Sequence, residues 1–230
     1  MKVGNLGEIE AVAFDIDGTL YAQWQIHFRA IFHYITRPFF FLKYGLVRNE
    51  MHGLKPLDNF VEVQAEKMAE KLHCTTEESL SLLDKNVYTG LSKYFTKIPC
   101  LPDVPETFQK FKEAGLKIAL LSDFPPEQKG EIWGIKKYCD VILGTEALGA
   151  LKPDPYSFLK MAEALEVPPE KILFVGNSKK YDLTGSKNAG MKCAFFTQNK
   201  FVRKVKGADF CFSKYRQLQD FVLKCNIKDN

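Results

Sequence analysis

Six short apolar runs recur along the chain, and each ends on small or polar residues. They cover residues 10–17, 116–123, 140–144, 171–177, 192–197 and 208–212. Each run is too short for a helix, and apolar runs without alternation are typical of strands buried on both faces. Segments with helical spacing of apolar residues lie between or after them, at 103–115, 155–167, 182–191 and 215–225. This alternation predicts an α/β fold, a Rossmann-like parallel sheet with helices on both faces.

About eighty residues separate the first two predicted strands, and their pattern is mainly helical. Residues 59–73 and 75–95 are amphipathic, and Thr75 or Thr76 with Glu77 or Glu78 predicts a capped helix start. Asp103 is expected to cap the helix that follows this segment. A connection of this length is too long for a loop. We therefore expect an inserted α-helical domain at residues 21–99 and a main domain formed by residues 1–20 and 100–230.

Residues 21–49 are rich in aromatic side chains interleaved with basic ones. We expect the run Phe39–Phe41 to form the core of a helix pair, with the basic residues in solvent. The alternative is a surface that recognises an anionic or aromatic substrate, and it stays open for Arg29 and Arg37. Trp24 could line a pocket or anchor a hinge. The four histidines show no metal-ligand spacing and are expected to be structural or at the surface.

Composition and charge narrow the class of protein. Hydrophobic residues make up 46% and charged residues 26% of 230 residues, which is ordinary for a globular chain with a core. The net charge of +4 suits anionic small molecules but is far from that of a nucleic-acid binder. The most apolar segment, 30–47, is interrupted by Arg37, Pro38 and Lys43, and the six cysteines are scattered. We expect a cytoplasmic monomer or homodimer with free thiols and no nucleic-acid or membrane partner.

Polar residues follow the predicted strands in a regular order. They are Asp15, Asp17, Thr19, Ser122, Asp123, Lys152, Asn177 and Asp182. Each alone is common turn chemistry. Ligands of open α/β sheets, however, bind at the carboxyl ends of the strands, where these residues would gather. Together they predict one site at that edge of the sheet.

Four segments carry a family resemblance. "FDIDGTL", "LLSD", "GALKPDP" and "FVGNSKKYDLTGSKNAGM" occur in this order, and they resemble the four motifs of the haloacid dehalogenase-like hydrolase superfamily. The resemblance covers residues 8–20 and about 101–212. The helical segment directly after the first motif resembles the family's C1-type cap, which a phosphatase-type member would carry.

The resemblance implies a set of catalytic roles. Asp15 would be the nucleophile that forms an aspartyl-phosphate intermediate, and Asp17 the general acid and then the general base. Mg²⁺ is the expected cofactor, because the candidate ligands on Asp15, Asp17, Asn177 and Asp182 are all oxygen atoms. Asn177 departs from the aspartate usual in the fourth motif. An amide oxygen carries no charge, so we expect weaker metal affinity there.

The remaining motif residues would bind the phosphoryl group of the substrate. Ser122 would hold phosphoryl oxygens, and Lys152 would place a positive charge beside the nucleophile. Thr19 and Asp123 are also expected to belong to the substrate-binding residues. The side chain of Asp123 is nevertheless expected to turn away, because a further carboxylate beside a phosphate is unfavourable.

The leading hypothesis is a Mg²⁺-dependent phosphatase that acts on a small phosphorylated metabolite. One alternative is a 2-haloacid dehalogenase or a phosphomutase of the same superfamily. Asp17 favours phosphoryl chemistry over dehalogenation, because a departing halide needs no proton. The other alternative is a catalytically weakened phosphoryl-binding protein, and Asn177 is the feature that motivates it.

Overall fold

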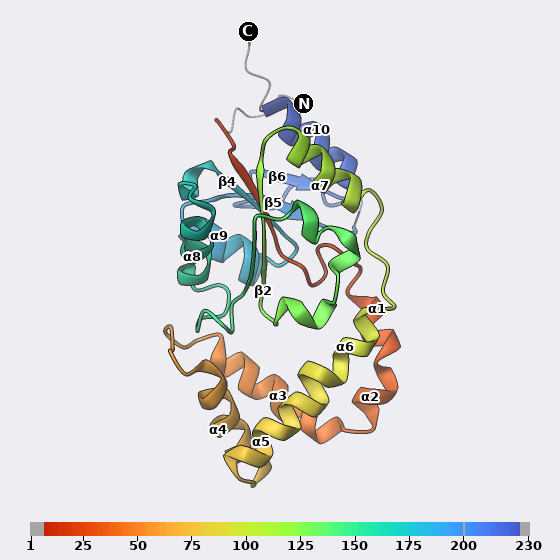
Figure 1. Ribbon diagram of the computed structural model, residues 1–230, viewed down its shortest axis with the longest axis vertical. Coiled ribbons are helices and arrows are strands. Elements are labelled where there is room, and N and C mark those ends of the chain that lie inside the picture. Colours follow the sequence, from red (N-terminus) through yellow and green to blue (C-terminus); the bar gives the residue numbers. More distant parts are fainter. Residues whose placement is uncertain (1–6, 200, 226–230) are drawn as a thin grey trace.

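The computed structural model describes residues 7–199 and 201–225. Its core is a six-stranded parallel sheet in the order β3-β2-β1-β4-β5-β6 (Figure 1). The strands are β1 (Ala11–Phe14), β2 (Lys117–Ser122), β3 (Val141–Gly144), β4 (Ile172–Gly176), β5 (Lys192–Phe196) and β6 (Phe210–Phe212). Each coincides with one of the six apolar runs, so the predicted α/β fold with a parallel sheet is confirmed.

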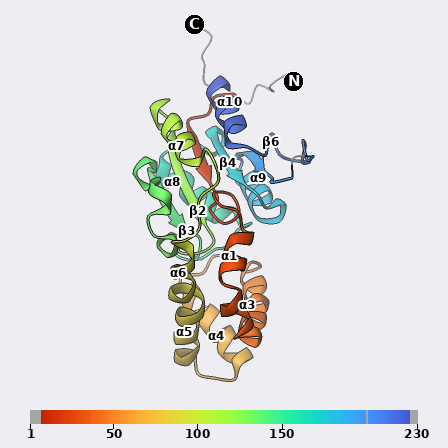
Figure 2. The ribbon, with the colours of Figure 1, turned by 90° about the vertical axis from the view of Figure 1, so that its right-hand side faces the viewer.

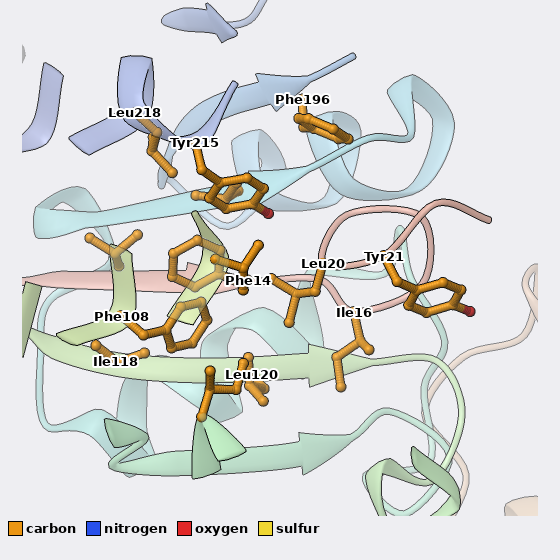
Figure 3. Close-up of a cluster of buried hydrophobic side chains, with 14 of the residues drawn as sticks. Phe14, Ile16, Leu20, Tyr21, Phe108, Ile118, Leu120, Phe196, Tyr215 and Leu218 are labelled. Carbon is orange, nitrogen blue, oxygen red and sulfur yellow. The ribbon is translucent and has the colours of Figure 1, made fainter. Parts of the chain in front are cut away.

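Helices cover both faces of this sheet. α7 (Val104–Glu113) and α10 (Tyr215–Cys225) lie on one face, and α8 (Pro155–Leu165) and α9 (Thr184–Asn188) lie on the other. β1 contributes to both cores, since its residues alternate between the faces. Phe14 stacks on Phe108 of α7 with ring centroids 4.5 Å apart (Figure 3), whereas Ala13 packs in the cluster that contains Phe158 of α8. This burial on both faces explains the uninterrupted apolar sequence of the strands.

A helical body, here called the insert, lies between β1 and β2 in the sequence. Its helices are α1 (Trp24–Arg29), α2 (Ile31–Ile35), α3 (Pro38–Met51), α4 (Phe60–Leu72), α5 (Thr76–Leu83), the π-turn η1 (Asp84–Tyr88) and α6 (Thr89–Phe95). The expected capping box is present, since Thr75 and Glu78 bond each other's backbone N–H groups. The insert lies beyond the carboxyl ends of the strands (Figures 1 and 2). The domain boundaries proposed above stay a prediction.

Loops at the carboxyl edge of the sheet contact the insert directly. Leu151 belongs to the same buried cluster as Val47 and Met51 of α3, and Phe124 packs against that cluster. Both residues follow core strands, so the apolar seam between insert and core passes beside the strand ends. Short 3-10 turns fill the connections after β2 and before β4, namely η2 (Pro126–Lys129), η3 (Ile132–Gly134), η4 (Lys136–Tyr138) and η5 (Pro169–Lys171).

Two expectations about local structure were confirmed only in part. Asp103 is the N-cap residue of α7, but it has a left-handed backbone with φ 65° and its side chain makes no capping bond. Its carboxylate instead lies 3.3 Å from Arg216. Phe40 is buried but Phe39 is 77% exposed, because consecutive helical residues point about 100° apart and cannot share one face. No helix in the described residues is long and apolar enough to cross a membrane.

Candidate active site

Asp15 lies directly after β1, where it is buried between two hydrogen-bond donors. Lys152 Nζ is 2.5 Å from Asp15 Oδ1, and the Thr19 hydroxyl donates to Asp15 Oδ2 at 2.8 Å. Burial raises the pKa of Asp15 to about 7, and the charges of Asp182 and Asp17 act in the same direction while Lys152 opposes them. A further positive charge in the cavity would therefore stabilise the carboxylate form of Asp15.

Thr19 is held in place by the chain itself. Its side chain is buried, and its backbone carbonyl accepts a hydrogen bond from the hydroxyl of Tyr215 at 2.9 Å. Tyr215 lies on α10 and its ring points toward the loop after β1 (Figure 3). The hydroxyl of Thr19 is directed at the carboxylate of Asp15. This geometry does not favour the expected contact between Thr19 and a substrate. Thr19 is better described as a residue that positions Asp15.

Asp17 accepts hydrogen bonds from three side chains. Tyr21 donates to Oδ1 at 2.7 Å, Ser122 donates to Oδ2 at 3.1 Å, and Lys129 Nζ lies 3.1 Å from Oδ2. Burial by itself would raise the pKa of Asp17, but the positive charge of Lys129 and the three hydrogen bonds outweigh it and lower the pKa. These contacts fix Asp17 in one orientation and favour its ionised form, so Asp17 must gain a proton before it can act as a general acid.

Lys129 is a site residue that sequence reasoning missed. It lies on η2, seven positions after Ser122, and its side chain is fully buried. Its ammonium also lies about 5 Å from the ring centroids of Phe95 and Phe124. Neither a motif nor a periodic pattern marks this position. The only available signal was a lysine close behind the second motif in sequence.

Lys152 connects the nucleophile to the loop after β4. Its ammonium lies 2.8 Å from Asp182 Oδ1 as well as 2.5 Å from Asp15 Oδ1. Burial alone would lower the pKa of this lysine, but the charges of Asp15 and Asp182 raise it well above the usual value. Lys152 is therefore a fixed cation in the centre of the site, as expected.

The loop after β4 is folded tightly around Asp182. Asp182 Oδ2 accepts hydrogen bonds from the backbone N–H groups of Asn177 at 3.1 Å and Ser178 at 2.9 Å. A Cβ atom on Gly176 would lie 2.6 Å from the same oxygen, so only glycine fits there. Both Asp182 oxygens are thus engaged by protein donors. Its main role in this geometry is to hold the loop, and direct metal ligation by Asp182 stays a prediction.

Asn177 packs across the loop that follows β1. Its side-chain nitrogen would be 2.3 Å from a Cβ atom on Gly18, whose φ is +86°. Glycine is required at position 18 by both the backbone conformation and this close approach. The two loops that carry Asp17 and Asn177 therefore touch, as the motif order predicts.

These residues border one cavity of about 420 Å³. Its lining includes Asp15, Asp17, Asp123, Lys152, Asn177, Ser178, Tyr181 and Asp182 from the core, and Arg48 and His52 from the insert. Ser122 is buried behind Asp17 and is not among the lining residues. A second hollow of about 330 Å³ is lined in part by Gly18, Trp24 and Asn177. The predicted site residues thus gather at one edge of the sheet.

Arg48 is the cation that the insert contributes to the cavity. One Nη atom lies 2.6 Å from Glu146 and donates to Gln64 at 3.0 Å, while the other donates to the carbonyl of Asp123 at 2.6 Å. The guanidinium also lies 4.7 Å from the ring centroid of Phe124. Arg29 and Arg37, the expected candidates, do not line this cavity. The helical spacing of Arg48 with Tyr44 and Met51, both buried, could have revealed that it faces inward.

Three further side chains were assigned incompletely from the sequence. Asp123 Oδ1 accepts hydrogen bonds from the Thr145 hydroxyl at 2.8 Å and from the backbone N–H of Lys152 at 3.1 Å, but Asp123 still lines the cavity. His52 contacts the carbonyl oxygen of Lys152 at 2.6 Å and stacks on Tyr181, with ring centroids 4.4 Å apart. Both residues line the cavity, and neither was assigned to the site from the sequence.

The donor atoms around the cavity suit a hard cation. Within residues 7–199 and 201–225, no group of three or more His, Cys, Asp or Glu side chains is arranged to hold a metal ion. A metal site here must therefore also use neutral oxygen donors. Asp15 offers a carboxylate, Asp17 a backbone carbonyl and Asn177 an amide oxygen, and such oxygen ligands are the kind that Mg²⁺ prefers. In donor chemistry the residues fit Mg²⁺, with less negative charge than three carboxylates would give.

Comparison with known proteins identifies the family. The sequence profile of the haloacid dehalogenase-like hydrolases matches residues 9–190, most of the chain. The chain belongs to the haloacid dehalogenase-like hydrolase family. It is therefore a hydrolase by family, and the resemblance carried by the four motifs is confirmed.

Relatives of this family member include proteins named as phosphatases. A putative pyrophosphatase PpaX of Caldanaerobacter subterraneus is 28% identical over 191 residues, which cover 80% of each chain. A phosphoglycolate phosphatase of Aquifex aeolicus is 36% identical over 96 residues, 40% of this chain and 45% of that one. Among solved structures, a 2-haloacid dehalogenase of Pseudomonas syringae has a TM-score of 0.69 at 18% identity and covers 94% of this chain and 99% of its own. At that identity the structural likeness shows the fold alone.

Proposed function

We propose that this chain is a Mg²⁺-dependent phosphatase that hydrolyses a small phosphorylated metabolite. The observation that carries the proposal is the pair Asp15 and Asp17 on the wall of one cavity, each fixed by a buried lysine. The relatives named as a pyrophosphatase and a phosphoglycolate phosphatase support phosphoryl chemistry.

The chemistry would proceed in two displacements at phosphorus. A carboxylate oxygen of Asp15 attacks, an O–P bond to Asp15 forms, and the bond to the leaving oxygen breaks as Asp17 gives that oxygen a proton. A water molecule then attacks the phosphoryl group on Asp15 and gives its proton to Asp17, which releases phosphate and restores both carboxyl groups. Lys152 offsets the charge on Asp15 and on the phosphoryl oxygens throughout.

Bound Mg²⁺ would supply positive charge between the nucleophile and the phosphoryl oxygens. Asp15, the backbone carbonyl of Asp17 and the side-chain oxygen of Asn177 would hold it, and Asp182 would keep the Asn177 loop in place. Because Asn177 is neutral, the affinity for the metal would be weaker than with an aspartate at this position.

The insert would act as the cap over this site. It contributes Arg48 and His52 to the cavity wall, and a cap that closes excludes water from the transferring group. Arg48 lines the cavity, so a substrate with a second anionic group would find a cation there. Pyrophosphate and phosphoglycolate, implied by the names of the two relatives, both carry such a group. We also propose that the protein is cytoplasmic and is a monomer or a homodimer.

The other hypotheses are supported less well. In the dehalogenase hypothesis a proton donor is unnecessary, yet Asp17 receives three hydrogen bonds that fix it beside the nucleophile. Nothing in the site favours the phosphomutase hypothesis over hydrolysis. The hypothesis of a weakened phosphoryl-binding protein rests on Asn177 alone, while Asp15, Asp17 and Lys152 lie together on the wall of the cavity.

Hydrolysis of p-nitrophenyl phosphate tests the proposal. The wild-type protein should release nitrophenol with added Mg²⁺, and both chelator and Asp15→Asn should abolish release. Asp220→Asn is a matched control, because Asp220 is exposed on α10, away from the cavity. Folded wild-type protein that turns over no phosphate ester or anhydride at any Mg²⁺ concentration would refute the proposal.

A further inference from the structure

The outer surface of α1, α2 and α3 is unusually apolar. Eight of the twelve large hydrophobic side chains that are strongly exposed in the described part of the chain lie between positions 24 and 46. They are Trp24, Phe28, Ile31, Phe32, Ile35, Phe39, Leu42 and Leu46, with exposed fractions from 46% to 77%. We call this set the apolar face. Contiguous exposed patches of more than about a few hundred Å² mark interaction sites on soluble proteins.

The helices present this face by their ordinary periodicity. On α3, Phe39, Leu42 and Leu46 are spaced three and four positions apart and share one side, while Phe40 and Val47 are buried on the other. Surface helices normally carry polar residues opposite their buried stripe. α2 packs against both α1 and α3, and Figure 2 shows α1 and α3 on the same side of the insert, away from α5 and α6. The three helices that carry these apolar residues thus lie together on one side of the insert.

The formal charges within the segment that carries the apolar face all have one sign. Residues 18–49 contain no Asp or Glu, although the composition of the chain would place about four in a segment of that length. Arg29, Arg37 and Lys43 lie on or beside these helices, are partly exposed, and form no ion pair with the described residues. The fourth cation of the segment, Arg48, turns inward to Glu146. An apolar surface with uncompensated cations therefore faces outward.

We propose that the apolar face binds the surface of a lipid bilayer rich in anionic lipids, with α1, α2 and α3 lying along the interface. Helices of this kind bury Trp, Phe and Leu side chains at the boundary of headgroups and acyl chains, while Lys and Arg meet the lipid phosphates. The contact is peripheral, since it needs no spanning helix. It departs from the expectation, drawn from the sequence, that the chain has no membrane partner.

Charge makes a second copy of the chain a poorer occupant of this face. In a two-fold contact each patch meets itself, so Arg29, Arg37 and Lys43 would face like charges with no carboxylate in the segment to pair them. A partner protein would instead be expected to insert anchors into pockets. Of the eight apolar side chains only Trp24 lines either of the two hollows described above. An exposed apolar surface that lies largely outside these two hollows fits the plane of a bilayer.

Sedimentation of the full chain with lipid vesicles tests this proposal. Vesicles of phosphatidylcholine with about one third phosphatidylglycerol should carry the protein into the pellet, less so as salt is raised. Phe32→Ser with Phe39→Ser should abolish binding. Arg37→Gln with Lys43→Gln should weaken it about 25-fold, at about fivefold for each cation. The matched control is Leu159→Ser, which removes an exposed leucine on α8 of the core.

Three results would overturn the proposal. The first is an absence of binding both to vesicles that contain phosphatidylglycerol and to vesicles of pure phosphatidylcholine. The second is equal binding to pure phosphatidylcholine, which would leave the cations without a role. The third is a dimer in light scattering that Phe32→Ser with Phe39→Ser dissociates, without vesicle binding, which would assign the face to a second copy. Thermal melting checks that the variants fold. Their hydrolysis of p-nitrophenyl phosphate should be unchanged, and this measurement separates a failure of the membrane proposal from a failure of the catalytic proposal.

Discussion

Lys129 Nζ lies 3.1 Å from Oδ2 of Asp17, and the lysine side chain has no exposure to solvent. An ammonium at this distance stabilises the ionised form of the carboxyl group and so lowers its pKa. A general acid must carry its proton when the leaving group departs. The pair therefore sets the pH above which Asp17 can no longer supply that proton.

Lys129→Met tests this relationship. Removal of the positive charge raises the pKa of Asp17, so the protonated acid persists to higher pH and the alkaline limb of the kcat profile should move upward by about one pH unit. Methionine can occupy the apolar space near Phe95 and Phe124. The measurement is kcat against pH for an alkyl phosphate, which needs the acid. An unchanged alkaline limb would show that Asp17 is not the proton donor. The control is Lys137→Met on the turn η4, which should leave the pH profile of kcat unchanged.

Arg48 and Glu146 form a buried ion pair between the insert and the core, 2.6 Å apart. Burial raises the pKa of Glu146 despite the arginine. Arg48→Met leaves this carboxyl without its cation, so we expect a loss of about 3–5 kcal/mol in the free energy of unfolding at neutral pH. The double variant with Glu146→Gln should recover much of that loss. Urea unfolding of the single and the double variant measures the two free energies of unfolding. Equal stability of the two variants would contradict the coupling between Arg48 and Glu146.

Asn177→Asp should strengthen metal binding. The substitution adds one negative charge to the donor set, so the Mg²⁺ concentration that gives half-maximal turnover should fall by about tenfold or more. Asn188→Asp makes the same chemical change on the exposed end of α9 and should leave the metal dependence unchanged. If Asn177→Asp does not alter the Mg²⁺ dependence, position 177 does not contact the metal.

The fold could be predicted because burial leaves a direct trace in the sequence. Strands such as β1 and β4 are covered on both faces, so they are apolar throughout and end abruptly on polar residues. All six strands run parallel, and this brings Asp15, Lys152 and Asp182 to one edge although they are far apart in the sequence. The motif order therefore predicted which core residues meet.

Residues placed by tertiary packing could not be predicted in the same way. Lys129 lies on a 3-10 turn without periodicity, and only the return of that turn toward Ser122 brings it to Asp17. Phe39 and Phe40 are chemically equal neighbours, and the orientation of α3 alone decides which of them is exposed. His52 and Tyr181 stack across the seam between insert and core, a contact between segments that share no pattern.

The most direct test of the catalytic account is the mass of protein quenched in acid during turnover of p-nitrophenyl phosphate by Asp17→Asn with Mg²⁺. Nitrophenolate leaves without help from an acid, but the second displacement lacks its base, so the phosphorylated enzyme should accumulate. We predict one added phosphoryl group on the peptide that contains Asp15, and none in the Asp15→Asn/Asp17→Asn double variant. Turnover with no phosphoryl group on that peptide, or with one on another residue, would contradict the account.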